Sequence, residues 1–132
     1  MKKITQFEDL ICWQSARELV KLVYTASNEN PLARDFGTKD QVKRAALSVM
    51  NNIAEGFARK SNKEFIRFLD IAQSSCIEVK SMTYVFQDLG YLPQEKIEKI
   101  RNKTDDTKKL TLGLIRYLAF KNGGSKPSNP NT

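Results

Sequence analysis

Basic side chains gather in one short stretch of the sequence, which holds Arg59, Lys60, Lys63 and Arg67. Lys and Arg at this density suit the phosphate groups of a polyanion, and a helix that begins beside them adds backbone amides that attract phosphate oxygens. We therefore predict that this cluster contacts a nucleic-acid backbone, with help from Lys39 and Lys43. The alternative is a solvated turn, because Lys and Arg are common at exposed corners.

The sequence contains no histidine. This removes histidine general bases, the nucleophile pairs that depend on them and almost every ordinary catalytic zinc site. The two cysteines, Cys12 and Cys76, are 64 positions apart and lack the spacing of a metal site. We therefore predict no catalytic residue, no metal and no cofactor, and expect that the protein is not an enzyme.

The N-terminus begins like a signal peptide, but Glu8 and Asp9 follow at once and no long apolar run comes after them. No stretch of the sequence approaches the roughly 18 apolar residues that a membrane span needs. In a chain without an export signal, both cysteines are expected to be reduced thiols in the core. We therefore expect a cytoplasmic protein that does not associate with membranes.

The composition is that of one globular domain, with 132 residues of which 40% are hydrophobic and 28% charged. There are 22 Lys and Arg residues against 15 Asp and Glu residues, so the formal net charge is +7. Residues 39–67 and 94–121 each carry a net charge of +4. In the second segment the basic residues alternate with acidic ones, which is typical of a solvated helix face.

Apolar residues recur at steps of three and four in four runs, which predicts four helices. The first covers about residues 7–28, the second opens with a capping box at Thr38 and ends near Gly56, and the third opens with a capping box at Ser61 and ends at Gly90. The fourth begins at Pro93 and continues to about residue 122. The third run carries two apolar stripes, so we expect it to be buried from two directions.

Four helices joined by short turns predict an all-α fold, an antiparallel up-down four-helix bundle over residues 1–122. Residues 123–132 contain no apolar side chain. A segment of this composition cannot bury enough apolar surface to fold, so we predict a disordered C-terminal tail.

A polar stripe runs along the second predicted helix beside its apolar stripe. It comprises Gln41, Arg44, Ser48, Asn51 or Asn52, and Glu55. A strip that only faces solvent is more often rich in Lys and Glu, so we favour a subunit interface that mixes apolar packing with polar pairs. The alternative is that these side chains cap or bridge neighbouring helices within one chain.

Several short sequence motifs are distinctive, among them Arg44-Ala45-Ala46, Asn52-Ile53-Ala54-Glu55-Gly56 and Gly90-Tyr91-Leu92. Over about residues 7–120 the chain resembles the bacterial four-helix bundle protein family, which is encoded within intervening sequences of 23S ribosomal RNA genes. The accessory variability determinants, which partner the reverse transcriptase of diversity-generating retroelements, use the same fold. The resemblance implies a basic, non-enzymatic homopentamer that suits nucleic acid.

Two functions of different classes follow. The first is a homopentameric adaptor that binds nucleic acid, most simply RNA or an RNA–DNA hybrid, through backbone contacts with little sequence specificity. The second is an accessory scaffold that binds a reverse transcriptase of a diversity-generating retroelement and supports its cDNA synthesis. The residues do not distinguish RNA from DNA or a hybrid.

Overall fold

The computed structural model describes residues 3–121 of the chain. Four long helices are joined by short connections, and two of these connections contain a single 3₁₀ turn. In chain order the elements are η1 (Phe7–Asp9), α1 (Ile11–Ser27), η2 (Leu32–Arg34), α2 (Phe36–Phe57), α3 (Asn62–Asp88) and α4 (Gln94–Lys121). The described residues form no β-strand, so the all-α fold is confirmed. The tail predicted over residues 123–132 lies outside the described residues.

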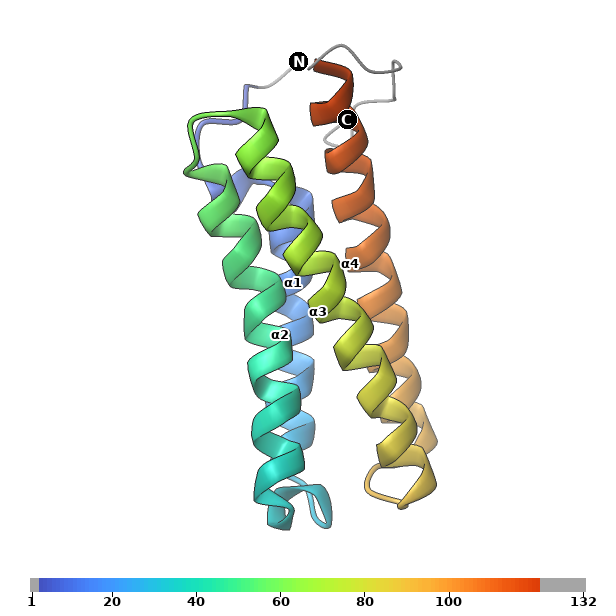
Figure 1. Ribbon diagram of the computed structural model, residues 1–132. Coiled ribbons are helices and arrows are strands. Elements are labelled where there is room, and N and C mark those ends of the chain that lie inside the picture. Colours follow the sequence, from blue (N-terminus) through green and yellow to red (C-terminus); the bar gives the residue numbers. More distant parts are fainter. Residues whose placement is uncertain (1–2, 122–132) are drawn as a thin grey trace.

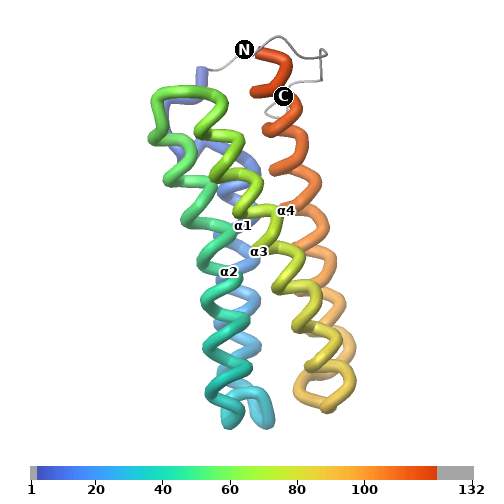
Figure 2. Tube along the Cα trace, viewed as in Figure 1, coloured from blue at the N-terminus to red at the C-terminus, as the bar shows by residue number. Residues whose placement is uncertain are grey.

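The four helices form an antiparallel bundle in which each helix packs against its two neighbours in chain order, and α4 closes the bundle against α1 (Figure 1). The α2–α3 turn lies at the same end of the bundle as the end of α4 (Figure 2). The α1–α2 and α3–α4 connections lie at the opposite end (Figure 2). Residues at the α2–α3 turn and residues at the start of α2 therefore lie at opposite ends of the bundle, separated by the length of α2.

The predicted apolar stripes form the core of the bundle. Leu19 on α1, Ile53 on α2 and Leu69 on α3 are all completely buried, and Ile97 and Ile100 on α4 are almost completely buried. One stripe of α3 is buried throughout, as predicted: Phe65, Leu69, Ala72, Cys76, Val79 and Phe86. The helices therefore pack through the 3–4 spacing that the sequence carries.

The middle of α4 places three threonines in this core, Thr104, Thr107 and Thr111, each with no exposed surface. Each hydroxyl donates to the backbone carbonyl four residues earlier, at 2.6 to 2.8 Å. Because a buried hydroxyl is costly only when it lacks a partner, these bonds let α4 bury polar side chains. Thr107 also contacts the buried hydroxyl of Ser15 on α1, at 2.6 Å between the two oxygens.

The Ser15–Thr107 pair leads to a prediction for stability. Replacing Thr107 with Val keeps the shape of the side chain but leaves the Ser15 hydroxyl without its partner, so we expect the free energy of unfolding to fall by about 1–2 kcal/mol. The double variant Ser15→Ala/Thr107→Val removes both hydroxyls and should recover most of that loss. Urea denaturation of the single and double variants measures both values. A double variant as unstable as the sum of the two single variants would contradict the pairing.

The start of α2 differs from the prediction. The helix begins at Phe36, and its N-cap is Asp35, whose Oδ1 accepts a hydrogen bond from the Thr38 amide at 3.1 Å. The capping box predicted at Thr38 was therefore wrong. The other carboxylate oxygen of Asp35 accepts from the Tyr91 hydroxyl at 2.7 Å, and these hydrogen bonds hold the pKa of Asp35 below its usual value. Asp35 thus both caps α2 and ties it to the α3–α4 turn.

Of two other predicted helix starts, that of α3 agrees with the structure and that of α1 does not. Ser61 caps α3, since its hydroxyl accepts a hydrogen bond from the Glu64 amide at 3.1 Å, as predicted. The first helix begins later than predicted, at Ile11, because Leu10 adopts an extended conformation and buries its side chain in the core. Residues 7–9 form the separate 3₁₀ turn η1.

Candidate nucleic-acid interface

The basic cluster predicted from the sequence is brought together at the α2–α3 turn. We call Arg59, Lys60, Lys63 and Arg67 the basic corner. Arg59 and Lys60 follow the C-cap of α2, whereas Lys63 and Arg67 lie in the first two turns of α3. All four are exposed. The α2–α3 turn that carries them lies at one end of the bundle (Figure 1). The corner also includes the N-terminus of α3, where the partial positive charge of the helix favours an anion.

Only one carboxylate forms an ion pair with the basic corner within the described residues. Arg67 Nε and Glu64 Oε2 are 3.0 Å apart, and a second hydrogen bond from the same guanidinium to Oε1 measures 3.3 Å. These bonds lower the pKa of Glu64. Arg59, Lys60 and Lys63 form no ion pair with any carboxylate in residues 3–121. The corner therefore keeps most of its positive charge available to a ligand.

An aromatic ring lies within the basic corner. The guanidinium carbons of Arg59 and Arg67 lie over the Phe68 ring, 4.8 and 4.9 Å from its centroid. Phe68 is half-buried, because its Cβ packs so closely on the end of α2 that a Cβ on Gly56 would come within 2.9 Å of it. From the sequence alone, Phe68 was predicted only as a member of the second apolar stripe of the third helix. The signal that could have singled it out is an aromatic residue directly after Arg67, close to the turn between two helices.

Lys39 and Lys43 lie away from the basic corner of the same protomer, and their help in binding nucleic acid stays a prediction. Both lie in the first turns of α2, and that helix is 22 residues or about 33 Å long. Lys39 donates to the Ala33 carbonyl at 3.3 Å, and Lys43 Nζ lies 4.6 Å from the centre of the Tyr24 ring. The contacts of these two lysines are therefore at the opposite end of the bundle from the basic corner.

The polar stripe of α2 divides into two groups. Gln41 donates to Glu78 on α3, the hydroxyls of Ser48 and Ser75 are 2.7 Å apart, and the Asn52 amide donates to the Ser48 carbonyl at 2.8 Å. These three residues bridge or cap within the chain, which was the alternative interpretation. The other three, Arg44, Asn51 and Glu55, are exposed on the outer face of α2.

The outer side of α3 is unusually apolar. It exposes Ile71, Ile77, Tyr84 and Val85, by 39%, 56%, 49% and 40%. Ile71 and Val85 belong to the second predicted apolar stripe, together with Phe68, Met82 and Leu89. Phe68 and Met82 are half-buried and the other three are exposed, so the expected burial of α3 from a second direction is only partial within the protomer. Because Glu78 accepts from Gln41, the strip that contains Ile71 and Val85 lies beside the polar stripe of α2. Together they make one outward surface, which we call the α2–α3 face.

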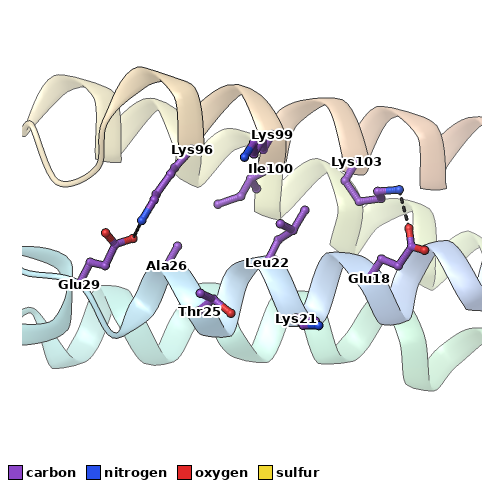
Figure 3. Close-up of a pocket in the computed structure, with 10 residues that line it drawn as sticks. All are labelled: Glu18, Lys21, Leu22, Thr25, Ala26, Glu29, Lys96, Lys99, Ile100 and Lys103. Carbon is purple, nitrogen blue, oxygen red and sulfur yellow. Dashed lines mark hydrogen bonds and ion pairs between the residues drawn. The ribbon is translucent and has the colours of Figure 1, made fainter.

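A groove of about 510 Å³ lies between α1 and α4 and offers a second group of lysines (Figure 3). Its floor is apolar and contains Leu22, Ala26 and Ile100. Lys103 is 2.6 Å from Glu18, and Lys96 pairs with Glu29 at the other end of the groove (Figure 3). Lys103 also lowers the pKa of Glu18.

The groove is a weaker anion site than the basic corner. Lys96, Lys99 and Lys103 each form an ion pair with a glutamate, so a phosphate would have to displace a carboxylate of the protein itself. The glutamates also place negative charge beside any bound anion. The basic corner therefore has more unpaired positive charge than the lysines of the groove.

The described residues contain no group of three or more Cys, Asp or Glu side chains that could hold a metal ion. Cys12 and Cys76 are buried and free, and burial raises the pKa of each thiol to about 12. Both are therefore protonated thiols at neutral pH, which are poor nucleophiles and poor metal ligands. No helix within residues 3–121 is long and apolar enough to cross a membrane.

Comparison with known proteins identifies the family of the chain. A family profile described as 23S rRNA-intervening sequence protein matches residues 8–113, which span all of α1 to α3 and most of α4. The chain belongs to this family. The matched segment includes the basic corner and the whole α2–α3 face, so both features lie within the part that the family shares.

A solved structure supports the same fold. The crystal structure of a protein with unknown function from the S23 ribosomal protein family of Bacteroides thetaiotaomicron superimposes with a TM-score of 0.74. The two proteins are 24% identical, and the alignment covers 81% of this chain and 96% of the other. At this identity the likeness shows a common fold and no more. No curated protein matches the chain.

Proposed function

We propose that this member of the 23S rRNA-intervening sequence protein family is a non-enzymatic RNA-binding protein that contacts phosphate groups through the basic corner. The observation that carries the proposal is the unpaired positive charge of that corner. Of its four basic side chains, only Arg67 forms an ion pair with a carboxylate within residues 3–121. The family description, which refers to ribosomal RNA genes, favours RNA as the ligand. The buried, reduced thiols of Cys12 and Cys76 suit the cytoplasm.

The chemistry of the corner determines how selective such binding is. Lysine ammonium groups contact phosphates as point charges and carry no information on base sequence. We therefore expect contact with RNA or an RNA–DNA hybrid and little discrimination between sequences. The net charge of +7 on each chain adds a long-range attraction that speeds the encounter.

Assembly of several copies would multiply this effect. We propose a homopentameric ring that forms through the α2–α3 face, where exposed apolar side chains of α3 lie beside Arg44, Asn51 and Glu55 of α2. An interface of this kind has an apolar centre and a polar rim, as stable protein interfaces do. Five copies would pool a charge of about +35 and bind one long RNA at several points.

The salt dependence of binding tests this function. We expect the logarithm of the association constant for a structured RNA to fall linearly with the logarithm of the salt concentration, by about 0.9 for each phosphate contact. Four contacts from a single basic corner give a slope of about −3.6, and contacts from several subunits make it steeper. Fluorescence anisotropy with a labelled RNA measures the slope. A flat dependence on salt would contradict phosphate binding.

The exposed α3 surface also supports a second candidate function, in which the protein is an accessory subunit of a reverse transcriptase of a diversity-generating retroelement. In that case the partner enzyme covers the apolar side chains Ile77 and Tyr84, and nucleic acid is held mainly by the enzyme. The two candidates are distinguished by titrating RNA into the isolated protein. Salt-sensitive binding without a partner supports the first, and binding only in the presence of the enzyme supports the second.

A further inference from the structure

We propose that the basic corner is built to stack an unpaired base, so that the preferred RNA has single-stranded nucleotides. This inference rests on the proposed RNA-binding function and adds a substrate class to it. Phosphate contacts alone would not distinguish a single strand from a duplex beyond their charge density. The side chains around Phe68 are what would let the protein distinguish a single strand from a duplex.

Two guanidinium groups lie close to the ring of Phe68. Arg59 comes from the segment after α2 and Arg67 from α3, yet both lie over the same ring at 4.8 and 4.9 Å. Each arginine is also held by a second bond: Arg59 Nε donates to the Glu55 carbonyl at 3.3 Å, and Arg67 donates twice to Glu64. Both guanidinium groups therefore have a hydrogen-bond partner within the chain as well as the ring.

The base of the Phe68 side chain packs against α2. The side chain of Phe68 lies against α2 where Gly56 has no Cβ, and any larger residue at position 56 would collide with it. Phe65, one turn earlier, points into the core and makes an edge-to-face contact with Phe57 at 6.0 Å. Phe68 itself is half-buried, so part of its side chain stays exposed at this end of the bundle.

Such a cluster matches the chemistry of an unpaired nucleotide. A nucleobase stacks equally well on an aromatic ring and on a guanidinium plane, whereas a base inside a duplex has no free face. Lys60 and Lys63 are exposed and form no ion pair within residues 3–121, so they are placed to contact the phosphates on either side of the stacked base. Cations beside a stacking platform are the usual components of a single-strand binding site.

The test compares one labelled RNA strand with the same strand in a full duplex, at equal salt, for the full-length protein. Replacing Phe68 with Leu removes the ring but keeps an apolar side chain, and we expect about tenfold weaker binding of the single strand, because one base stack is worth about 1.4 kcal/mol. Duplex binding and both salt slopes should stay unchanged, since no charge is lost. Phe68→Tyr keeps the ring and should bind as the parent protein does.

Phe36 provides a matched control, because it is an exposed phenylalanine with Lys39 over its ring at 4.7 Å, but at the other end of the bundle. Phe36→Leu should leave binding of both probes unchanged. Equal losses on single strand and duplex in Phe68→Leu, or no loss on either, would overturn the stacking site while leaving phosphate binding intact. If the parent protein binds neither probe, the proposed function itself fails.

Discussion

Replacing Lys60 and Lys63 together with Glu is expected to weaken RNA binding by about 60-fold at 0.1 M salt. Each phosphate contact with a duplex adds about 0.9 to the slope of log K against log salt, which is roughly eightfold in affinity between 1 M and 0.1 M. Two lost contacts multiply to about 60-fold and reduce the slope by about 1.8. Because every subunit of an assembly carries the change, this value is a lower bound. Anisotropy titrations at several salt concentrations measure both quantities.

Lys39 and Lys43 supply the matched control for this experiment. The double variant Lys39→Glu/Lys43→Glu changes the net charge by the same amount on the same chain, but at the opposite end of α2. If only the total charge of the protein mattered, the two double variants would lose affinity equally. We expect the variant at the basic corner to lose far more, and an equal loss would show that binding does not depend on that corner. Thermal unfolding of both variants checks that each is folded.

The bundle could be predicted from the sequence because the apolar spacing determines which face of each helix is buried. Leu69 and Val79 on α3, for example, are both completely buried, as their spacing requires. The start of α2 could not be predicted in the same way, since both Asp35 and Thr38 are good capping residues. The Tyr91 hydroxyl, 56 residues away in sequence, bonds to Asp35, and no local pattern contains that contact.

The candidate site was predicted in part. Arg59, Lys60, Lys63 and Arg67 were expected to gather at one end of the bundle because they flank a helix–helix turn, and the structure places them there. The separation of Lys39 from that corner follows from the helix rise of 1.5 Å per residue and was predictable. The position of the Phe68 ring close to two arginines was not, because it depends on how closely α2 and α3 approach at Gly56.

The α2–α3 face leads to the second large prediction, which concerns assembly. Replacing Ile71 and Val85 with Glu places two charges on the apolar strip of α3, and burying an unpaired charge in an interface is strongly unfavourable. We expect the parent protein to sediment as the proposed pentamer and the double variant to sediment as a single chain of 15.1 kDa. Both side chains are exposed in the protomer, so the fold itself should tolerate the change.

Tyr24 on α1 and Leu112 on α4 allow a matched control. Their exposed fractions of 36% and 38% are close to the 39% and 40% of Ile71 and Val85, but they lie away from the α2–α3 face. Tyr24→Glu/Leu112→Glu should sediment as the parent protein does. A parent protein that is already monomeric, or a control that dissociates as readily as the test variant, would exclude this face as the subunit interface.

We expect the proposed assembly to strengthen the proposed RNA binding through multivalency. The Ile71→Glu/Val85→Glu variant keeps its own basic corner intact, so each separate chain should still bind RNA in a salt-dependent manner. What it loses is the second and later contacts with the same RNA, which in a linked assembly raise affinity by about 10²- to 10⁴-fold. The loss should therefore be large for a long RNA and small for one that spans a single corner. An equal loss on both RNAs would mean that the face binds the RNA directly, and that assembly is not what strengthens binding.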